Sequence, residues 1–172
     1  MIELKEIKVF ITTVATGKSW LALNDDRFFD LDDWFVKYKY GIDEHKTYAE
    51  LETLKSSKLK QVRFDEKEKT IEKMNEVIGQ GKIVFMNNNE FFIEHLLENN
   101  IPYCFVYNKQ NANDEIIERL RKRGNPKEWY QSIADKIAEW REFNAQDVRP
   151  TIKIELNKGE YLADILSKVF PR

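Results

Sequence analysis

The chain has little of the chemistry on which extracellular and metal-binding domains depend. Its 172 residues include one cysteine, Cys104, and two histidines. A single cysteine excludes an internal disulfide and a zinc site built from cysteines. The sequence has no run of about 18 apolar residues, the length that spans a bilayer, and residues 1–6 lack the basic-then-apolar order of a secretion signal. We therefore expect a cytoplasmic protein without a membrane partner, in which Cys104 is a core residue.

An excess of charge of one sign is also absent. The chain has 28 basic and 30 acidic residues, which gives a net charge of −2. This balance creates no general attraction to nucleic acids, so we expect no nucleic-acid partner. Hydrophobic residues make up 42% of the chain, enough for a packed core. The length predicts a single domain over residues 1–172, and the oligomeric state stays open.

Short apolar runs alternate with segments of helical period along the whole chain. The apolar runs predict strands at residues 8–12, 27–32, 82–86 and 103–107, and the alternation of residues 151–156 predicts a fifth. The periodic segments predict helices at residues 19–24, within 41–80, at 90–99, at 113–123, from 126 onward and at 161–169. This alternation indicates a three-layer α/β fold with a central parallel sheet that is covered on both faces. The highly charged residues 41–70 are predicted to form an insertion on top of the sheet.

The first predicted strand leads into a loop of small residues that ends in Gly17-Lys18-Ser19. The layout matches the phosphate-binding motif G-x-x-x-x-G-K-[ST], except that Thr12 occupies the position of the first glycine. In this motif the lysine reaches the β- and γ-phosphates and the hydroxyl joins the Mg²⁺ shell, so we assign these roles to Lys18 and Ser19. Thr12 is the predicted weak point, because β-branched residues resist the positive φ that glycine can adopt. An ordinary strand–turn–helix is the alternative.

Acidic residues follow the second predicted strand, in the order Asp30-Leu31-Asp32-Asp33. If the strand continues through them, Asp30 and Asp32 point the same way, at the sheet edge where α/β proteins collect ligands. Such a pair could hold hydrated Mg²⁺ or accept a proton from a substrate hydroxyl. The alternative is that Asp32 or Asp33 caps a helix that starts at Trp34.

A basic helix later in the chain carries Arg119 and Arg123 on one face, four residues apart. Arginines suit the negative charge that spreads over the oxygens of a transferring phosphoryl group. The alternative is a solvated helix in which these arginines pair with Glu115 and Glu118. No acid occurs in residues 87–89, after the third strand, so the predicted protein ligands of Mg²⁺ are Ser19 and Asp30, with Asp32 beside them.

The order of these segments resembles that of small P-loop nucleotide-kinase-like proteins of phages and Gram-positive bacteria. This family is similar to nucleoside monophosphate kinases and shikimate-kinase-like enzymes. The resemblance covers most of the chain. Its segments are Ala15-Thr16-Gly17-Lys18-Ser19, Asp30-Leu31-Asp32, Asn100-Ile101-Pro102-Tyr103, Glu115 to Arg123-Gly124-Asn125, Trp140, and Leu156 to Tyr161-Leu162.

The resemblance implies a three-layer P-loop NTPase fold with a helical acceptor and lid insertion. Residues 40–80, including Arg63, would bind the acceptor, and residues 113–130 would form a lid with Arg119 and Arg123. ATP would lie against residues 15–20: Ala15, Thr16, Gly17, Lys18, Ser19 and Trp20.

The predicted function is an ATP-dependent phosphotransferase that uses Mg-ATP, with a nucleoside or deoxynucleoside monophosphate as the acceptor. A hydroxyl-bearing small molecule or nucleoside is the second acceptor class, because paired aspartates suit proton abstraction. The third possibility is a non-catalytic protein that binds or senses a nucleotide.

Overall fold

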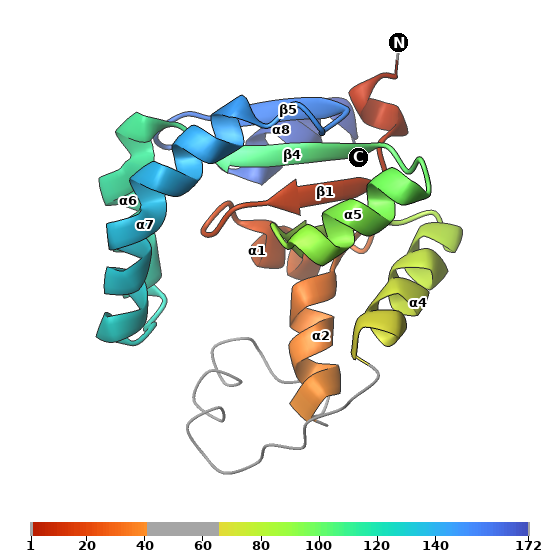
Figure 1. The fold of residues 1–172 in the computed structure, drawn as a ribbon, viewed down its shortest axis with the longest axis horizontal. Coiled ribbons are helices and arrows are strands. Elements are labelled where there is room, and N and C mark those ends of the chain that lie inside the picture. Colours follow the sequence, from red (N-terminus) through yellow and green to blue (C-terminus); the bar gives the residue numbers. More distant parts are fainter. Residues whose placement is uncertain (1, 41–65, 172) are drawn as a thin grey trace.

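The computed structural model describes residues 2–40 and 66–171. Five parallel strands form one sheet in the order β2-β3-β1-β4-β5, and Figure 1 shows β1, β4 and β5 side by side. The strands are β1 (Val9–Thr12), β2 (Phe28–Asp30), β3 (Ile83–Asn87), β4 (Tyr103–Asn108) and β5 (Ile152–Leu156). All five strands predicted from the sequence are therefore present. The second is shorter than predicted and ends at Asp30.

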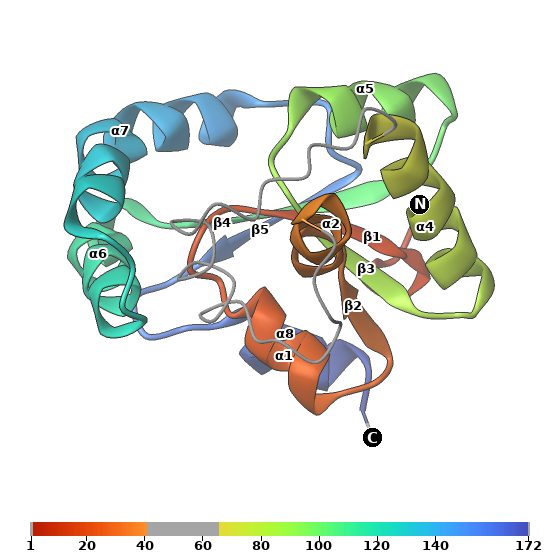
Figure 2. The ribbon, with the colours of Figure 1, turned by 90° about the horizontal axis from the view of Figure 1, so that it is seen from below.

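Helices cover both faces of this sheet. The α-helices are α1 (Lys18–Asn24), α2 (Leu31–Tyr40), α4 (Glu66–Gly79), α5 (Glu90–Glu98), α6 (Asn113–Lys122), α7 (Lys127–Gln146) and α8 (Leu162–Val169). Short 3₁₀ helices lie at Leu4–Glu6 and Gln110–Ala112. Figure 2 shows α4, α5 and α7 on one side of the sheet and α1 and α8 on the other. The predicted α/β fold with a parallel central sheet is confirmed.

The alternation of side chains along the strands builds two separate cores. Val9 and Ile11 of β1 belong to the core beneath α2, α4 and α5, whereas Phe10 belongs to the core beneath α1 and α8. Every residue of β1 is buried because helices cover both faces of this strand. Cys104 lies in the second core with no exposed surface, as predicted. Burial raises the pKa of its thiol to about 12.

A third core lies beyond the carboxyl edge of the sheet, between α6 and α7. These two helices form a hairpin that packs around Ile116, Leu120 and Ile133, and the loop residues Val14 and Ala15 pack against it. The predicted lid, residues 113–130, is made of α6 and the beginning of α7. The predicted acceptor region, residues 40–80, lies mostly outside the described residues. Its last part is α4, whose Met74 and Val77 are buried in the first core.

The strand order makes the chain leave the neighbouring strands β1 and β3 toward opposite faces of the sheet. From β1 the chain crosses to α1 on one face, and from β3, the neighbour of β1, it crosses to α5 on the opposite face. The segments that follow β1 and β3 therefore diverge at the carboxyl edge. Open α/β sheets bind their ligands in the crevice that such a divergence leaves. Among the described residues, no helix is long and apolar enough to cross a membrane.

Candidate functional site

A cleft of about 1160 Å³ opens at the carboxyl ends of β1, β2 and β3. Its walls come from α1 and α2 on one side and from the α6–α7 hairpin on the other. The predicted site residues line this cleft, except Arg63, which lies outside the described residues. They are Ala15, Thr16, Gly17, Lys18, Ser19, Trp20, Asp30, Asp32, Arg119 and Arg123. The structure thus brings together residues that lie up to about a hundred positions apart in the sequence.

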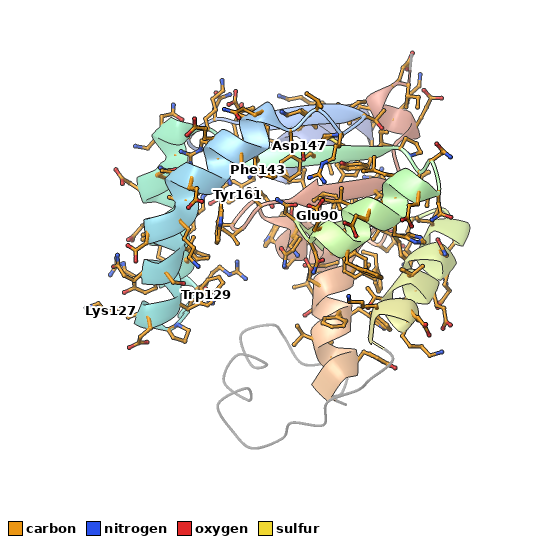
Figure 3. The ribbon with its side chains drawn as sticks, in the orientation of Figure 1. Glu90, Lys127, Trp129, Phe143, Asp147 and Tyr161 are labelled. Carbon is orange, nitrogen blue, oxygen red and sulfur yellow. The ribbon has the colours of Figure 1, made fainter. Side chains whose placement is uncertain are left out.

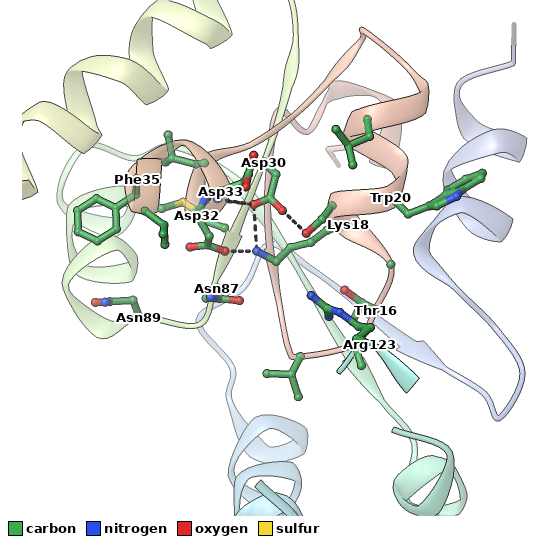
Figure 4. Close-up of a pocket in the computed structure, with 18 of the residues that line it drawn as sticks. Thr16, Lys18, Trp20, Asp30, Asp32, Asp33, Phe35, Asn87, Asn89 and Arg123 are labelled. Carbon is green, nitrogen blue, oxygen red and sulfur yellow. Dashed lines mark hydrogen bonds and ion pairs between the residues drawn. The ribbon is translucent and has the colours of Figure 1, made fainter. Parts of the chain in front are cut away.

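A compact ion network joins the end of the loop to the end of β2 (Figure 4). The Nζ atom of Lys18 lies 3.0 Å from Oδ1 of Asp30 and also forms an ion pair with Asp32. The hydroxyl of Ser19 donates a hydrogen bond of 2.6 Å to Oδ2 of Asp30. Asp30 therefore contacts both groups that the motif assigns to phosphates and metal. Side chains from α1, β2 and α2 meet in this network.

Asp30 also caps helix α2. Its Oδ1 accepts hydrogen bonds from the backbone N–H groups of Asp32, at 3.1 Å, and Asp33, at 3.4 Å. The alternative in which Asp32 or Asp33 caps a helix starting at Trp34 is therefore wrong, because α2 begins at Leu31. The prediction that Asp30 and Asp32 point the same way because they alternate along one strand is also wrong, since Asp32 lies in the first turn of α2. Asp32 and Asp30 still meet at Lys18, because the chain turns from strand into helix between them.

The network changes the proton affinities of its members. Burial lowers the pKa of Lys18, but the two carboxylates together outweigh it, so this pKa lies above its ordinary value. For the carboxyl group of Asp32, the effect of burial on the pKa is larger than the effect of the ion pair. Burial, supported by the nearby charge of Asp30, raises its pKa against the lowering effect of Lys18. Asp32 thus holds a proton more readily than an exposed aspartate does.

The loop backbone contains two residues in the left-handed region, Ala15 with φ of 60° and Gly17 with φ of 89°. Thr12, the predicted weak point, is instead an ordinary residue of β1 that pairs with Asn87 and Val106. The expected conflict between its β-branched side chain and a positive φ does not arise. The strain lies at Ala15, because a non-glycine residue adopts this conformation at a cost of about 1 kcal/mol or more.

The loop presents a row of backbone donors. In the described part of the chain, the N–H groups of residues 14–19 donate to no protein acceptor. The buried hydroxyl of Thr16 likewise has no partner there. Successive backbone N–H groups that turn around a positive φ form a concave site for anions, and the N-terminus of α1, which follows directly, adds a favourable dipole.

Arg119 holds this loop from the other side. Its guanidinium donates to the carbonyl of Ala15 at 2.9 Å, to the carbonyl of Glu160 at 3.2 Å and to the carboxylate of Glu115 at 2.8 Å. It also stacks on the ring of Tyr161, 3.8 Å from the ring centre. The pairing with Glu115 that the sequence left as an alternative is therefore present. Arg119 binds the strained Ala15 rather than pointing alone into the cleft.

Glu115 and Tyr161 complete this clamp, which we define as Glu115, Arg119 and Tyr161. The second carboxylate oxygen of Glu115 accepts the N–H of Gly159 at 2.7 Å. These contacts outweigh the effect of burial and lower the pKa of Glu115 below its ordinary value. Tyr161 covers Gly17 so closely that a Cβ there would lie 3.0 Å from its Cδ1 atom. The clamp thus ties α6, the β5–α8 connection and the loop together.

Sequence reasoning did not assign the aromatic wall of the cleft to the site. Phe35 of α2, Phe91 and Phe92 of α5 and Trp129 of α7 line the cleft, and Trp129 projects toward it from the hairpin (Figure 3). The amides of Asn87 and Asn89 border it as well. Periodicity alone assigns such aromatic residues to the core. Only the positions of α2, α5 and α7 around the carboxyl edge place them at the cleft.

No model of a known family, no curated protein and no solved structure matches this chain. The function must therefore be argued from the site itself.

Proposed function

We propose that this protein is a P-loop phosphotransferase that uses Mg-ATP as the phosphoryl donor. One observation carries the proposal: Lys18, Ser19 and Asp30 meet at the end of a loop whose N–H groups have no described protein acceptor. A lysine, a hydroxyl and a row of backbone donors are what a chain of phosphates requires. Their place beside the divergence of α1 and α5 supports the assignment further.

The residues present fit a magnesium ion. Mg²⁺ prefers oxygen ligands and is commonly held by one or two carboxylates together with phosphates and water. The hydroxyl of Ser19 and the carboxylate of Asp30 lie 2.6 Å apart and would supply the protein ligands. When bound, Mg²⁺ neutralises the charge of the phosphate oxygens. Lys18 would exchange its carboxylate partners for the phosphates, since its ammonium group is charged and adjoins the loop.

The acceptor is proposed to bind on the wall formed by α2 and α5. A nucleoside monophosphate is the acceptor that the family resemblance implies. One observation favours the second class, a hydroxyl-bearing small molecule or nucleoside. On this wall, among the described residues, Asp32 and Asp33 line the cleft together with Phe35, Phe91 and Phe92, and no arginine does. Lys67 of α4 also lines the cleft, with its Nζ atom 4.4 Å from the centre of the Phe91 ring. An anionic acceptor phosphate would therefore meet two carboxylates and one lysine there, whereas a hydroxyl would meet a base.

Asp32 is proposed as that base. Its pKa lies above the ordinary value despite the ion pair with Lys18. When Lys18 turns to the phosphates, Asp32 loses part of its stabilising charge and its proton affinity rises further. A general base works best when its pKa approaches the operating pH. Donor binding would thereby prepare Asp32 to accept the proton of the acceptor hydroxyl.

The decisive experiment measures ADP release with Mg-ATP and a panel of monophosphates, nucleosides and small polyols. Turnover that depends on one of these acceptors supports the phosphotransferase. Saturable ATP binding with no turnover above background for any acceptor would instead favour the nucleotide sensor. Absence of ATP binding would overturn the assignment of the loop.

The variant Asp32→Asn separates the two acceptor classes. For a hydroxyl acceptor, turnover should fall about 10²- to 10⁴-fold, the usual contribution of a general base, while ATP affinity changes little. The matched control is Asp33→Asn, which removes a carboxylate from the same helical turn, where it pairs with Lys37. Equal turnover in Asp32→Asn and the parent protein would exclude the base and return the monophosphate to first place.

A further inference from the structure

A second cavity of about 460 Å³ lies behind the phosphate loop, between α7 and the carboxyl ends of β1, β3 and β4. It meets the first cleft only at Val14 and Asn87, which line both. Figure 3 labels Phe143 on α7 and Glu90 at the start of α5, two residues that border it. Its size falls within the range of small-molecule sites, about 300 to 1000 Å³. Nothing in the proposed phosphoryl transfer uses it.

Aromatic side chains form much of its wall. Trp140 and Phe143 stand three positions apart on α7, so both lie on one face of that helix. They remain 41% and 59% exposed although they are large and apolar. Tyr107 of β4 lines the cavity opposite the helix and is buried. Exposed aromatic groups around a hollow are suited to stacking on a flat ring.

Amide groups supply most of the polar lining. The lining asparagines are Asn87, Asn88, Asn108 and Asn144. Asn144 is buried on α7, and its Oδ1 accepts a hydrogen bond of 3.3 Å from Nδ2 of Asn88. Amides offer a donor and an acceptor side by side, and this pattern matches the edges of heterocyclic bases. Few charged side chains line the cavity, and one of them, Glu90, is paired with Arg149.

Two buried polar atoms at the floor of the cavity have no hydrogen-bond partner among the described residues. Asn108 commits its Nδ2 to Thr13 and to the carbonyl of Val14, both at 3.3 Å. Its Oδ1 is buried and has no partner among the described residues, and the same holds for Nη1 of Arg141. Arg141 itself donates through Nε to the carbonyl of Asn108 at 2.9 Å. Unsatisfied buried polar atoms of this kind call for a partner outside the chain.

From these features we infer that the cavity is a second binding site, for a neutral heterocyclic base or its nucleoside. The ring would stack against Trp140 and Phe143, and its polar edge would meet the asparagine amides. A donor group on the ring matches the acceptor Oδ1 of Asn108, and a ring carbonyl matches the guanidinium of Arg141. A base with an adjacent N–H and C=O, as in uracil or guanine, is therefore preferred over adenine.

Titration calorimetry of the protein with uridine, guanosine, adenosine and ribose tests this site. We expect saturable binding of uridine or guanosine, weaker binding of adenosine and none of ribose. Trp140→Ala should weaken the binding about tenfold or more, in line with the loss of one stacking contact. Trp129→Ala, a substitution in the first cleft, and Lys18→Ala should leave it within about twofold. Circular dichroism confirms that each variant is folded.

Two results would overturn the inference. The first is the absence of saturable binding of any nucleoside up to millimolar concentration. The second is binding that Trp129→Ala or Lys18→Ala abolishes and Trp140→Ala leaves intact, because the nucleoside would then occupy the first cleft. Since the test requires neither ATP nor turnover, its failure would leave the proposed Mg-ATP donor site untouched. The absence of any nucleoside binding would remove nucleosides, but not other hydroxyl compounds or monophosphates, from the proposed acceptors.

Discussion

The two flanks of the loop that ends in Gly17-Lys18-Ser19 are built in different ways. On the side of α1 and α2, charged side chains bind one another: Lys18 pairs with Asp30 and Asp32. On the side of α6 and α8, Arg119 pairs with Glu115, but both side chains also bind backbone: Arg119 holds the carbonyls of Ala15 and Glu160, and Glu115 accepts the N–H of Gly159. A side chain that pairs with another side chain can exchange its partner for a ligand. A side chain that holds backbone carbonyls fixes the shape of the loop.

The contrast assigns the two flanks to separate tasks. The Lys18 flank supplies groups that are proposed to bind phosphate, metal and acceptor, whereas the clamp holds the loop in position. The sequence predicts that Arg119 acts on the transferring phosphoryl group. Its three protein acceptors favour a positioning role in the structure described here. Arg123, which also lines the cleft, stays the proposed lid arginine.

The largest expected effect follows from Lys18→Ala. Removing the ammonium group should weaken ATP binding by at least tenfold, about 1.4 kcal/mol, because the phosphates lose their only lysine in this network. Calorimetric titration with Mg-ATP measures the affinity. Lys168→Ala, on the exposed surface of α8, is the matched control. Unchanged affinity in a folded Lys18→Ala protein would mean that the loop does not bind phosphates.

The clamp is expected to affect the stability of the fold more than the affinity for ATP. Arg119→Lys keeps the charge but cannot reach two carbonyls and a carboxylate at once, so stability should fall by about 1–3 kcal/mol. The KM for ATP should rise while kcat changes less. Arg123→Lys should show the reverse, a lower kcat at nearly constant stability, since that side chain is exposed. If both variants lowered kcat alone, the division between flanks would be wrong.

The clamp also predicts a dependence on pH. The pKa of Glu115 is lowered in the folded protein, so this group binds fewer protons folded than unfolded. Its contribution to stability is therefore complete above the ordinary carboxyl pKa of 4.5 and is lost as the pH falls through the lowered value. Comparing urea unfolding of the parent protein and Glu115→Gln across this range measures it. The difference between them should shrink toward acid pH, and a constant difference would contradict the assignment.

The sequence predicted the architecture well because the central strands β1 and β4 are fully buried and β3 is buried except at its last residue. Runs such as residues 103–107 are apolar on both faces, so burial alone marks them as parallel strands. The boundary near Asp30 was predicted less well. Three acids within four residues are compatible with a strand end or a helix start, and only the hydrogen bonds from the N–H groups of Asp32 and Asp33 to Asp30 decide between them. Residues 41–65, predicted to be an insertion, lie outside the described residues.

The candidate site was predictable where the chemistry is local and was missed where it is assembled from distant segments. Gly17-Lys18-Ser19 is contiguous, so its strand and helix context identifies it. The contacts of Arg119 with Ala15 and Glu160 join segments about a hundred and about forty residues apart. No spacing rule encodes such contacts. Thr12 is the residue that departs from the motif, yet the positive φ values of the loop lie at Ala15 and Gly17.

The smallest predicted effect compares Gly17 with a remote glycine. Gly17 and Gly124 have similar φ values, 89° and 78°, so alanine at either position should cost about 1 kcal/mol in backbone strain. Gly17→Ala should cost more, because its Cβ would lie 3.0 Å from Tyr161, whereas nothing lies within 4 Å of one at Gly124. Thermal unfolding measures both. The excess should disappear in a Tyr161→Ala background, and an excess that persists there would show that Tyr161 does not press on the loop.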